Sequence, residues 1–219
     1  MHSEVTGRSG WLGWLRPDFV VDSVLNLTAE DIMRMSPATR AVCLDIDGTI
    51  TDYHAPSVPK RSAERLLSYT DAGLLTFIIS NCYDERVTEV HRLFDPLVTG
   101  VLTPADAVDR DDPRDRPGKH IKPSPDMLLT VTRRYEVTDE AAPRPLGTRE
   151  LLMVGDQIFK DVLAARRAGA ASVLVPKLGS KDHLGVLIFQ RPVEYVLRAV
   201  LRLPVKRRSW PRRLTRAPR

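Results

Sequence analysis

The chain has 219 residues, enough for one domain with short appendages, and 42% of them are hydrophobic, which allows a sizeable core. No apolar run approaches the roughly 18 residues that span a bilayer, and residues 1–10 lack the apolar segment of a signal peptide, so we expect a cytoplasmic protein. The net charge of +5 arises at the end of the chain, because residues 206–219 contain seven Lys or Arg and no acid.

Short apolar runs alternate with helical patterns along the body of the chain. The runs that predict buried strands are 40–45, 74–79, 97–102, 151–154 and 171–175. The segments that predict helices are 62–72, 84–94, 124–135 and 160–168, the first and last closed by Gly73 and Gly169. This alternation predicts an α/β fold, a doubly wound, Rossmann-like parallel sheet with helices on both faces.

The polar segments divide the rest of the chain. Residues 103–120 and 137–148 have no apolar period, so we expect loops there, the first of them exposed. We expect one domain over 15–205, after an amphipathic or flexible segment 1–14 and before a disordered basic tail 206–219.

Polar side chains follow the ends of the predicted strands or open the next helix. They are Asp45, Asp47, Thr49, Ser80, Asn81, Lys122, Asp156 and Asp161. Ligands of open parallel sheets bind beyond the carboxyl ends of the strands, so we expect these residues to meet at one site.

These residue types suit the hydrolysis of a phosphate monoester. A carboxylate such as Asp45 can attack phosphorus and form an acyl phosphate, provided that a cation screens the dianion. Mg²⁺ prefers oxygen ligands, which Asp45 and Asp156 would supply. Asp47 is placed to protonate the leaving oxygen, while Ser80 and Lys122 can hold the phosphoryl oxygens.

The order of these motifs resembles the four motifs of the haloacid dehalogenase (HAD) superfamily. They are Asp45-Ile-Asp-Gly-Thr, Ser80, Lys122 and Gly155-Asp-Gln-Ile-Phe-Lys-Asp. The resemblance implies a nucleophilic Asp45 and an acid/base Asp47, and the second acid implies phosphoryl transfer instead of dehalogenation. It further implies phosphate binding by Thr49, Ser80, Asn81 and Lys122, and Mg²⁺ binding by Asp45, the Asp47 carbonyl, Asp156 and, in support, Asp161. Thr49 also braces the loop in this interpretation, and Asn81 either binds substrate or shapes its turn.

The spacing between the motifs leaves no room for a cap domain. Thirty residues separate Thr49 from Ser80 and forty separate Asn81 from Lys122, which the predicted elements use up. We therefore expect a capless, open site for a large substrate such as a protein or a lipid, or a site closed by a homo-oligomer. The loop 103–120 is the candidate lid.

The flanks of the domain favour an anionic surface as a partner. A helix predicted over 193–203 gathers Val193, Val196, Leu197, Val200 and Leu201 on one face, and the basic tail follows. Either the helix packs on the domain or it lies on a membrane. The tail suits lipid or RNA equally, although we expect no specific nucleic acid.

Residues 15–24, 155–169 and 189–194 resemble HAD subfamily IIIA, which contains phosphatidylglycerophosphate phosphatases of phospholipid biosynthesis. Gly48 stands where that subfamily has Asn. The resemblance implies a lipid headgroup as substrate, at the inner face of the membrane. The alternatives are a phosphatase of a soluble sugar or nucleotide monophosphate, and a non-catalytic adaptor that binds anionic surfaces.

Overall fold

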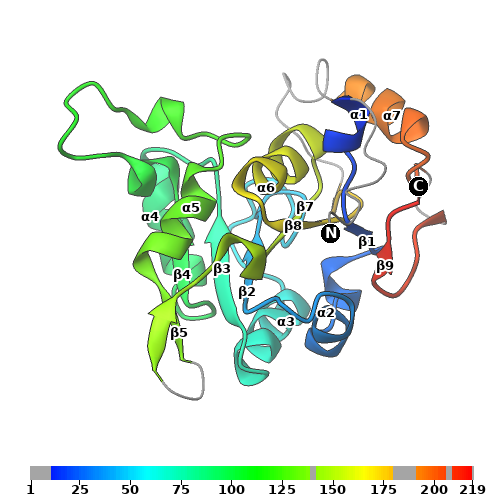
Figure 1. Ribbon diagram of the computed structural model, residues 1–219, viewed down its shortest axis with the longest axis horizontal. Helices are drawn as coiled ribbons and strands as arrows, with labels where there is room; N and C mark the ends of the chain where they lie inside the picture. The colour runs from blue at the N-terminus through cyan, green and yellow to red at the C-terminus, as the bar shows by residue number, and fades with distance from the viewer. Residues whose placement is uncertain (1–10, 139–141, 180–190, 206–208, 219) are drawn as a thin grey trace, which may run out of the picture.

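A seven-stranded sheet runs through the computed structural model, which describes residues 11–138, 142–179, 191–205 and 209–218 (Figure 1). The strand order is β4-β3-β2-β7-β8-β1-β9, with all neighbours parallel except the antiparallel pair of β1 and β9. The strands are β1 (Phe19–Val20), β2 (Ala41–Leu44), β3 (Leu75–Ile79), β4 (Gly100–Leu102), β7 (Leu151–Gly155), β8 (Ala171–Leu174) and β9 (Thr215–Arg216). The α/β fold predicted from the sequence is confirmed.

Helices cover both faces of the sheet. They are α1 (Trp11–Trp14), α2 (Ala29–Met35), α3 (Lys60–Asp71), α4 (Glu85–Phe94), α5 (Asp126–Arg134), α6 (Leu163–Ala168) and α7 (Arg191–Val200). Alternate residues of β2 enter different cores: Val42 and Leu44 pack with α3 and α4, whereas Ala41 and Cys43 pack with α5 and α6. Burial on both faces explains why the central strands are continuous apolar runs.

Two glycines end helices where the sequence predicts. Gly73 (φ +81°) directly follows the C-cap residue of α3, and Gly169 (φ +80°) is the C-cap of α6. Both adopt the left-handed conformation that glycine reaches without steric cost.

Three segments differ from the expectation. The expected loop 137–148 contains the antiparallel strands β5 (Glu136–Thr138) and β6 (Pro143–Pro145). A π-helical turn, Ile158–Val162, precedes α6. The strands β1 and β9 were not predicted, because each pairs over only two residues and two residues are too few to form an apolar pattern.

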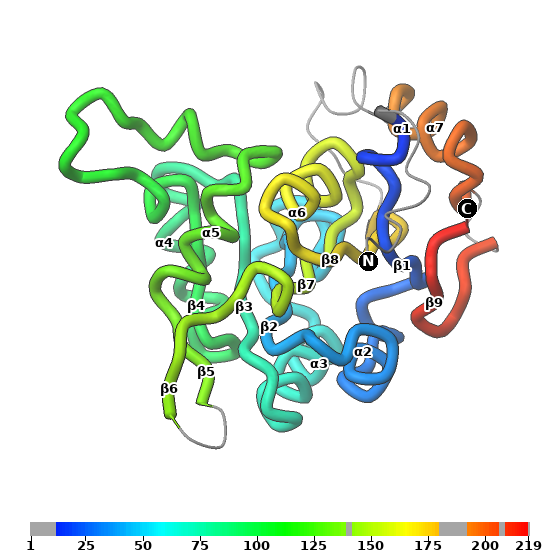
Figure 2. Tube along the Cα trace, viewed as in Figure 1, coloured from blue at the N-terminus to red at the C-terminus, as the bar shows by residue number. Residues whose placement is uncertain are grey.

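The described part of the basic tail, residues 209–218, contains the short strand β9. Strand β9 lies beside β1, as the tube in Figure 2 shows, with the Arg216 guanidinium 5.6 Å from the centre of the Phe19 ring. Trp210 is buried in one apolar cluster with Leu15 and Leu197. This burial of apolar area offsets the chain entropy that a basic segment would otherwise retain.

The apolar pattern of helix α7 does not predict which of its apolar side chains are buried. Leu197 and Leu201 are buried, but Val193, Val196 and Val200 are 49%, 65% and 54% exposed. The five residues expected on one face are therefore divided between the core and the surface. Within the described residues, no helix has the length and hydropathy needed to cross a bilayer.

Candidate active site

The carboxyl ends of β2 and β7 place two acids side by side. The Asp45 N–H donates to the Val154 carbonyl at 3.0 Å, and Leu44 is in register with Val154. Asp45 therefore leaves β2 next to Gly155 and Asp156, which end β7 and follow it. Parallel pairing thus joins two motifs that lie more than a hundred residues apart in the sequence.

Asp47 lies on a tight turn that requires glycine at the next position. Gly48 has φ +87°, and its N–H donates to the Thr51 carbonyl at 2.8 Å. A Cβ atom at Gly48 would lie 3.1 Å from an Asp156 carboxylate oxygen, so a side chain there would crowd the acid as well as strain the backbone.

Three carboxylates converge at the edge of the sheet. One oxygen each of Asp45, Asp156 and Asp161 can be chosen so that all three lie within 4.8 Å of one another. Asp156 and Asp161 are buried, and Asp45 faces the cavity described below. An all-oxygen donor set of this charge suits Mg²⁺, so the residues present fit the metal that the sequence predicts.

Asp161 depends on the glycine that ends β7. A Cβ at Gly155 would lie 2.2 Å from Asp161 Cγ, a distance that side chains do not tolerate. The Asp161 carboxylate accepts from the Gln157 N–H at 3.1 Å and from Lys122 Nζ at 2.8 Å. Burial raises the pKa of Asp161 to about 7; Lys122 opposes this shift, and the carboxylates of Asp45 and Asp156 add to it.

Lys122 brings positive charge into the acid cluster. Its ammonium donates to Asp45 Oδ1, to Asp161 Oδ1 and to the Ile79 carbonyl at 2.9 Å, and its side chain is 2% exposed. Burial lowers the pKa of Lys122, but the two ion pairs outweigh burial and raise it. The lysine therefore stays charged. Lys119, three positions earlier, has a side chain that is 61% exposed.

Asn81 braces the backbone of Lys122. The Lys122 N–H donates to Asn81 Oδ1 at 2.8 Å, and Asn81 Nδ2 donates to the Lys122 carbonyl at 3.3 Å. Asn81 also lines the cavity. It therefore shapes the turn and at the same time lies next to the space for substrate.

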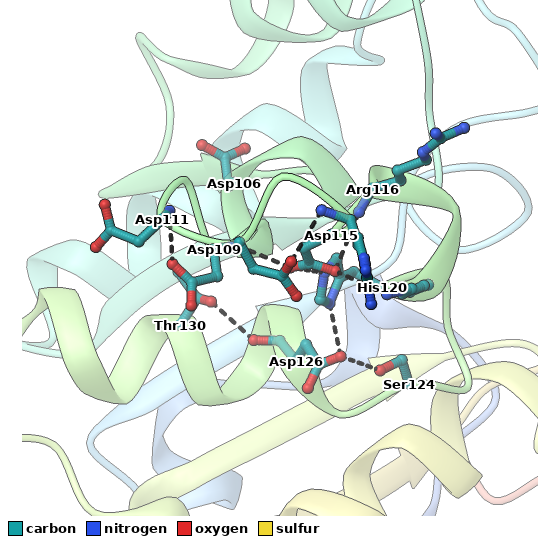
Figure 3. A network of polar contacts seen from close by, with 12 residues as sticks. Asp106, Asp109, Asp111, Asp115, Arg116, His120, Ser124, Asp126 and Thr130 are labelled. Carbon is teal, nitrogen blue, oxygen red and sulfur yellow. Dashed lines mark hydrogen bonds and ion pairs between the residues drawn. The ribbon is translucent and has the colours of Figure 1, made fainter.

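The segment before Lys122 is held by a histidine between two carboxylates (Figure 3). His120 Nδ1 lies 2.7 Å from Asp126 Oδ2, and Nε2 lies 2.8 Å from Asp115 Oδ2. Burial lowers the pKa of His120, but the bonds to Asp126 and Asp115 outweigh burial and raise it. The loop 103–120 is largely exposed, as expected, yet this cluster ties its end to α5.

A cavity of about 350 Å³ opens over these groups. Five of the expected site residues line it: Asp45, Asp47, Ser80, Asn81 and Lys122. The other lining residues had no role assigned from the sequence, and they are Tyr53, His54, Cys82, Tyr83, Arg86, Gln157 and Lys160. Most of them lie within a few positions of a predicted site residue, and this closeness in the sequence could have identified them.

Thr49 is buried in the turn that carries Asp47. It is 2% exposed and does not line the cavity, and its N–H donates to the Ile46 carbonyl at 3.1 Å. Its backbone braces the turn that carries Asp47, as the sequence also suggested, and its part in phosphate binding stays a prediction.

Asp47 faces both the cavity and a guanidinium. Its carboxylate accepts from the His54 N–H at 2.9 Å, and Arg86 Nη2 lies 3.6 Å from Asp47 Oδ1. Burial raises the pKa of Asp47 more than the His54 N–H and the Arg86 charge lower it. A carboxyl group that keeps its proton to higher pH suits a general acid.

The α/β fold therefore carries three acids and one buried lysine at the carboxyl edge of its sheet. Residues 121–200 match the model of a HAD-hydrolase-like family, a range that includes Lys122, Asp156 and Asp161. The chain is 24% identical over 179 residues to the probable phosphatase YqeG of Bacillus subtilis (strain 168), covering 81% of this chain and 86% of that protein.

Solved structures give weaker similarities. The core domain of a putative phosphoglycolate phosphatase from Streptococcus pneumoniae TIGR4 is 20% identical, with TM-score 0.42, covering 70% of this chain and 96% of that one. The p-nitrophenyl phosphatase from Archaeoglobus fulgidus is 16% identical, with TM-score 0.41, covering 70% and 93%. The family match and the YqeG relative support a phosphoric monoester hydrolase.

Proposed function

We propose that the protein hydrolyses phosphate monoesters in a Mg²⁺-dependent reaction through a phospho-aspartate on Asp45. The observation that supports this most is the convergence of three acids and one buried ammonium at the carboxyl edge of the sheet. Bound Mg²⁺ would be held by the carboxylates of Asp45 and Asp156 and the carbonyl of Asp47, and would neutralise charge on the phosphoryl oxygens. Both Asp161 oxygens already have partners, which favours a supporting role.

Two displacements complete the proposed reaction. An Asp45 oxygen attacks phosphorus and the ester P–O bond breaks, while Asp47 gives its proton to the leaving oxygen. Asp47, now a carboxylate, takes a proton from water as that water attacks the phosphorus of the phospho-aspartate. Inorganic phosphate leaves and Asp45 is regenerated. Lys122 and Ser80 hold the transferred phosphoryl group throughout.

We propose phosphatidylglycerophosphate, presented at a membrane surface, as the substrate. The described segments between Thr49 and Lys122 contain no inserted domain, so the cavity has no cap that would exclude a lipid headgroup. The resemblance to HAD subfamily IIIA points to the same substrate.

Helix α7 offers a surface for the bilayer. Val193, Tyr195, Val196 and Val200 are each about half exposed or more, an apolar outer face that water alone does not favour. The exposed Arg202 at the end of the helix adds a cation for anionic lipid.

The inner face of α7 is tied to the acid cluster. Glu194 Oε1 accepts from the Phe159 N–H at 3.0 Å, and Arg198 Nη2 donates to the Asp156 carbonyl at 2.7 Å. A membrane that binds the outer face would therefore hold the site close to its headgroups. A second copy of the chain on this face is the alternative occupant.

The test measures Mg²⁺-dependent phosphate release from phosphatidylglycerophosphate in anionic vesicles and from soluble sugar and nucleotide monophosphates. We expect the lipid to be the better substrate and Asp45→Asn to be inactive on all of them. Strong activity on the soluble esters alone would show that the substrate is a soluble monophosphate and not the lipid. A wild-type rate in Asp45→Asn would end the mechanism.

Vesicle flotation tests the role of α7 separately. Val196→Asp places a charge on the outer face, and we expect it to weaken binding to anionic vesicles at low salt. The control is Leu67→Asp, which alters a 43% exposed apolar side chain on α3. Equal binding by both variants would remove α7 from the membrane proposal.

A further inference from the structure

Arg86 is a mostly buried cation at the wall of the candidate active site. It lies in the first turn of α4, lines the cavity, and its side chain is 11% exposed. Nη1 donates to Glu89 Oε2 at 2.6 Å, which holds the guanidinium in place. Nε and Nη2 are buried and make no hydrogen bond to any described residue.

Such an arrangement leaves hydrogen-bonding capacity unused. Buried polar atoms normally find partners, because an unmet donor loses its hydration without replacement. Nη2 lies 3.6 Å from Asp47 Oδ1, which is an ion-pair contact but too long for a good hydrogen bond. An oxyanion in the cavity would supply acceptors for the unused N–H groups, in the planar geometry that guanidinium favours.

The position of Arg86 decides which part of a substrate it meets. In the proposed mechanism Asp47 protonates the leaving oxygen, so Asp47 lies on the side of the alcohol that departs. Arg86 is beside Asp47, whereas Lys122 contacts the nucleophile Asp45. Arg86 therefore faces the leaving group, and Lys122 faces the phosphoryl group that is transferred.

We propose that Arg86 forms a second anion subsite, which binds a phosphodiester carried on the alcohol part of the substrate. Lys160, which lines the same cavity, adds positive charge to its wall. The subsite rests on the proposed function, because it takes its orientation from the roles of Asp45 and Asp47. It selects phosphomonoesters that carry a second negative charge a few atoms from the scissile bond. A neutral sugar or glycerol would leave the guanidinium unsatisfied.

The experiment compares two water-soluble substrates that differ in the second anion. They are glycerol 3-phosphate and glycerophosphoglycerophosphate, the deacylated headgroup, in which a phosphodiester is added to the same glycerol phosphate. The readout is the ratio of kcat/KM for the second substrate to that for the first. A charged hydrogen bond of ordinary strength corresponds to a ratio of about 10 to 100 in the wild type.

Substitutions at position 86 should change the ratio. We expect Arg86→Gln to bring it close to one through a higher KM for the headgroup, and Arg86→Lys to give an intermediate ratio. Arg92→Gln is the matched control, because Arg92 lies exposed on the same helix and outside the cavity lining. It should keep the wild-type ratio. Circular dichroism and thermal melting establish that each variant is folded.

The possible outcomes separate the subsite from the reaction. A wild-type ratio near one overturns the subsite, and so does an Arg86→Gln variant in which both substrates slow equally, which would mean that Arg86 acts only through Asp47. If the wild type does not hydrolyse phosphatidylglycerophosphate in vesicles but still prefers the soluble headgroup over glycerol 3-phosphate, the membrane substrate is rejected and the subsite is retained. If neither soluble substrate turns over, calorimetric binding of the headgroup to Asp45→Asn decides: unchanged affinity on adding Arg86→Gln refutes the subsite.

Discussion

Removal of the Lys122 ammonium should destabilise the protein more than its loss of volume predicts. Lys122→Met keeps the length of the side chain but leaves Asp45 and Asp161 without their shared cation, beside the buried Asp156. Breaking a buried ion pair by removing one partner costs about 3–5 kcal/mol. At about 2–4 °C per kcal/mol for a chain of this size, the Tm should fall by about 6–20 °C.

The assay is thermal unfolding in EDTA and in millimolar Mg²⁺. Since a bound cation would replace the lost positive charge, Mg²⁺ should raise the Tm of Lys122→Met more than that of the wild type. Lys119→Met is the control: its ammonium is 3.9 Å from Asp115 Oδ1 at the surface. A surface pair of this kind contributes about 0–1 kcal/mol.

Two results would refute the reasoning. A Lys122→Met variant that melts within about 2 °C of Lys119→Met would show that the buried ammonium stabilises the protein no more than a surface ammonium does. Equal Mg²⁺ stabilisation of the variant and the wild type would show that the metal does not bind beside this lysine.

Three further predictions concern the frame of the site. His120→Gln should destabilise the protein most below pH about 6.5, with the difference shrinking as the pH rises through the raised folded-state pKa of His120, as urea unfolding at several pH values would show. Gly155→Ala, whose Cβ would meet Asp161 at 2.2 Å, should lower both stability and Mg²⁺-dependent phosphate release, whereas Gly118→Ala, with no atom within 4 Å, should lower neither. Tyr69→Phe loses a 2.7 Å bond to a buried backbone carbonyl and should lower the free energy of unfolding by about 1–3 kcal/mol in chemical denaturation; no change would mean that water replaces the phenol.

The central strands and their helices could be predicted from the sequence because their physical causes are local. Continuous apolar runs indicate burial on both faces, and glycines mark helix ends. The polar residues after the strands could also be singled out, since parallel sheets bind ligands at that edge. These features lie within a few residues of each other, so no distant contact is needed to recognise them.

Other features depend on contacts between distant parts of the chain. Strand β9 exists because it pairs with β1, and Trp210 is buried because it packs with Leu15 and Leu197. The apolar pattern of α7 predicted a single apolar face, to be buried on the domain or laid on a membrane, yet Glu194 and Arg198 point inward. There Glu194 accepts from the Phe159 N–H, and Arg198 donates to the Asp156 carbonyl. A helix pattern does not reveal such partners.

The sequence by itself determined the α/β class and singled out the acids and the lysine that lie at the carboxyl edge of the sheet, because apolar runs and the charge of the residues after them are local patterns. Only the tertiary structure decided that Thr49 lies beneath the site, that His120 ties its loop to α5, and that Arg86 faces Asp47 from the wall of the cavity. These outcomes depend on which side chains meet after folding, and burial then sets their charge and their partners.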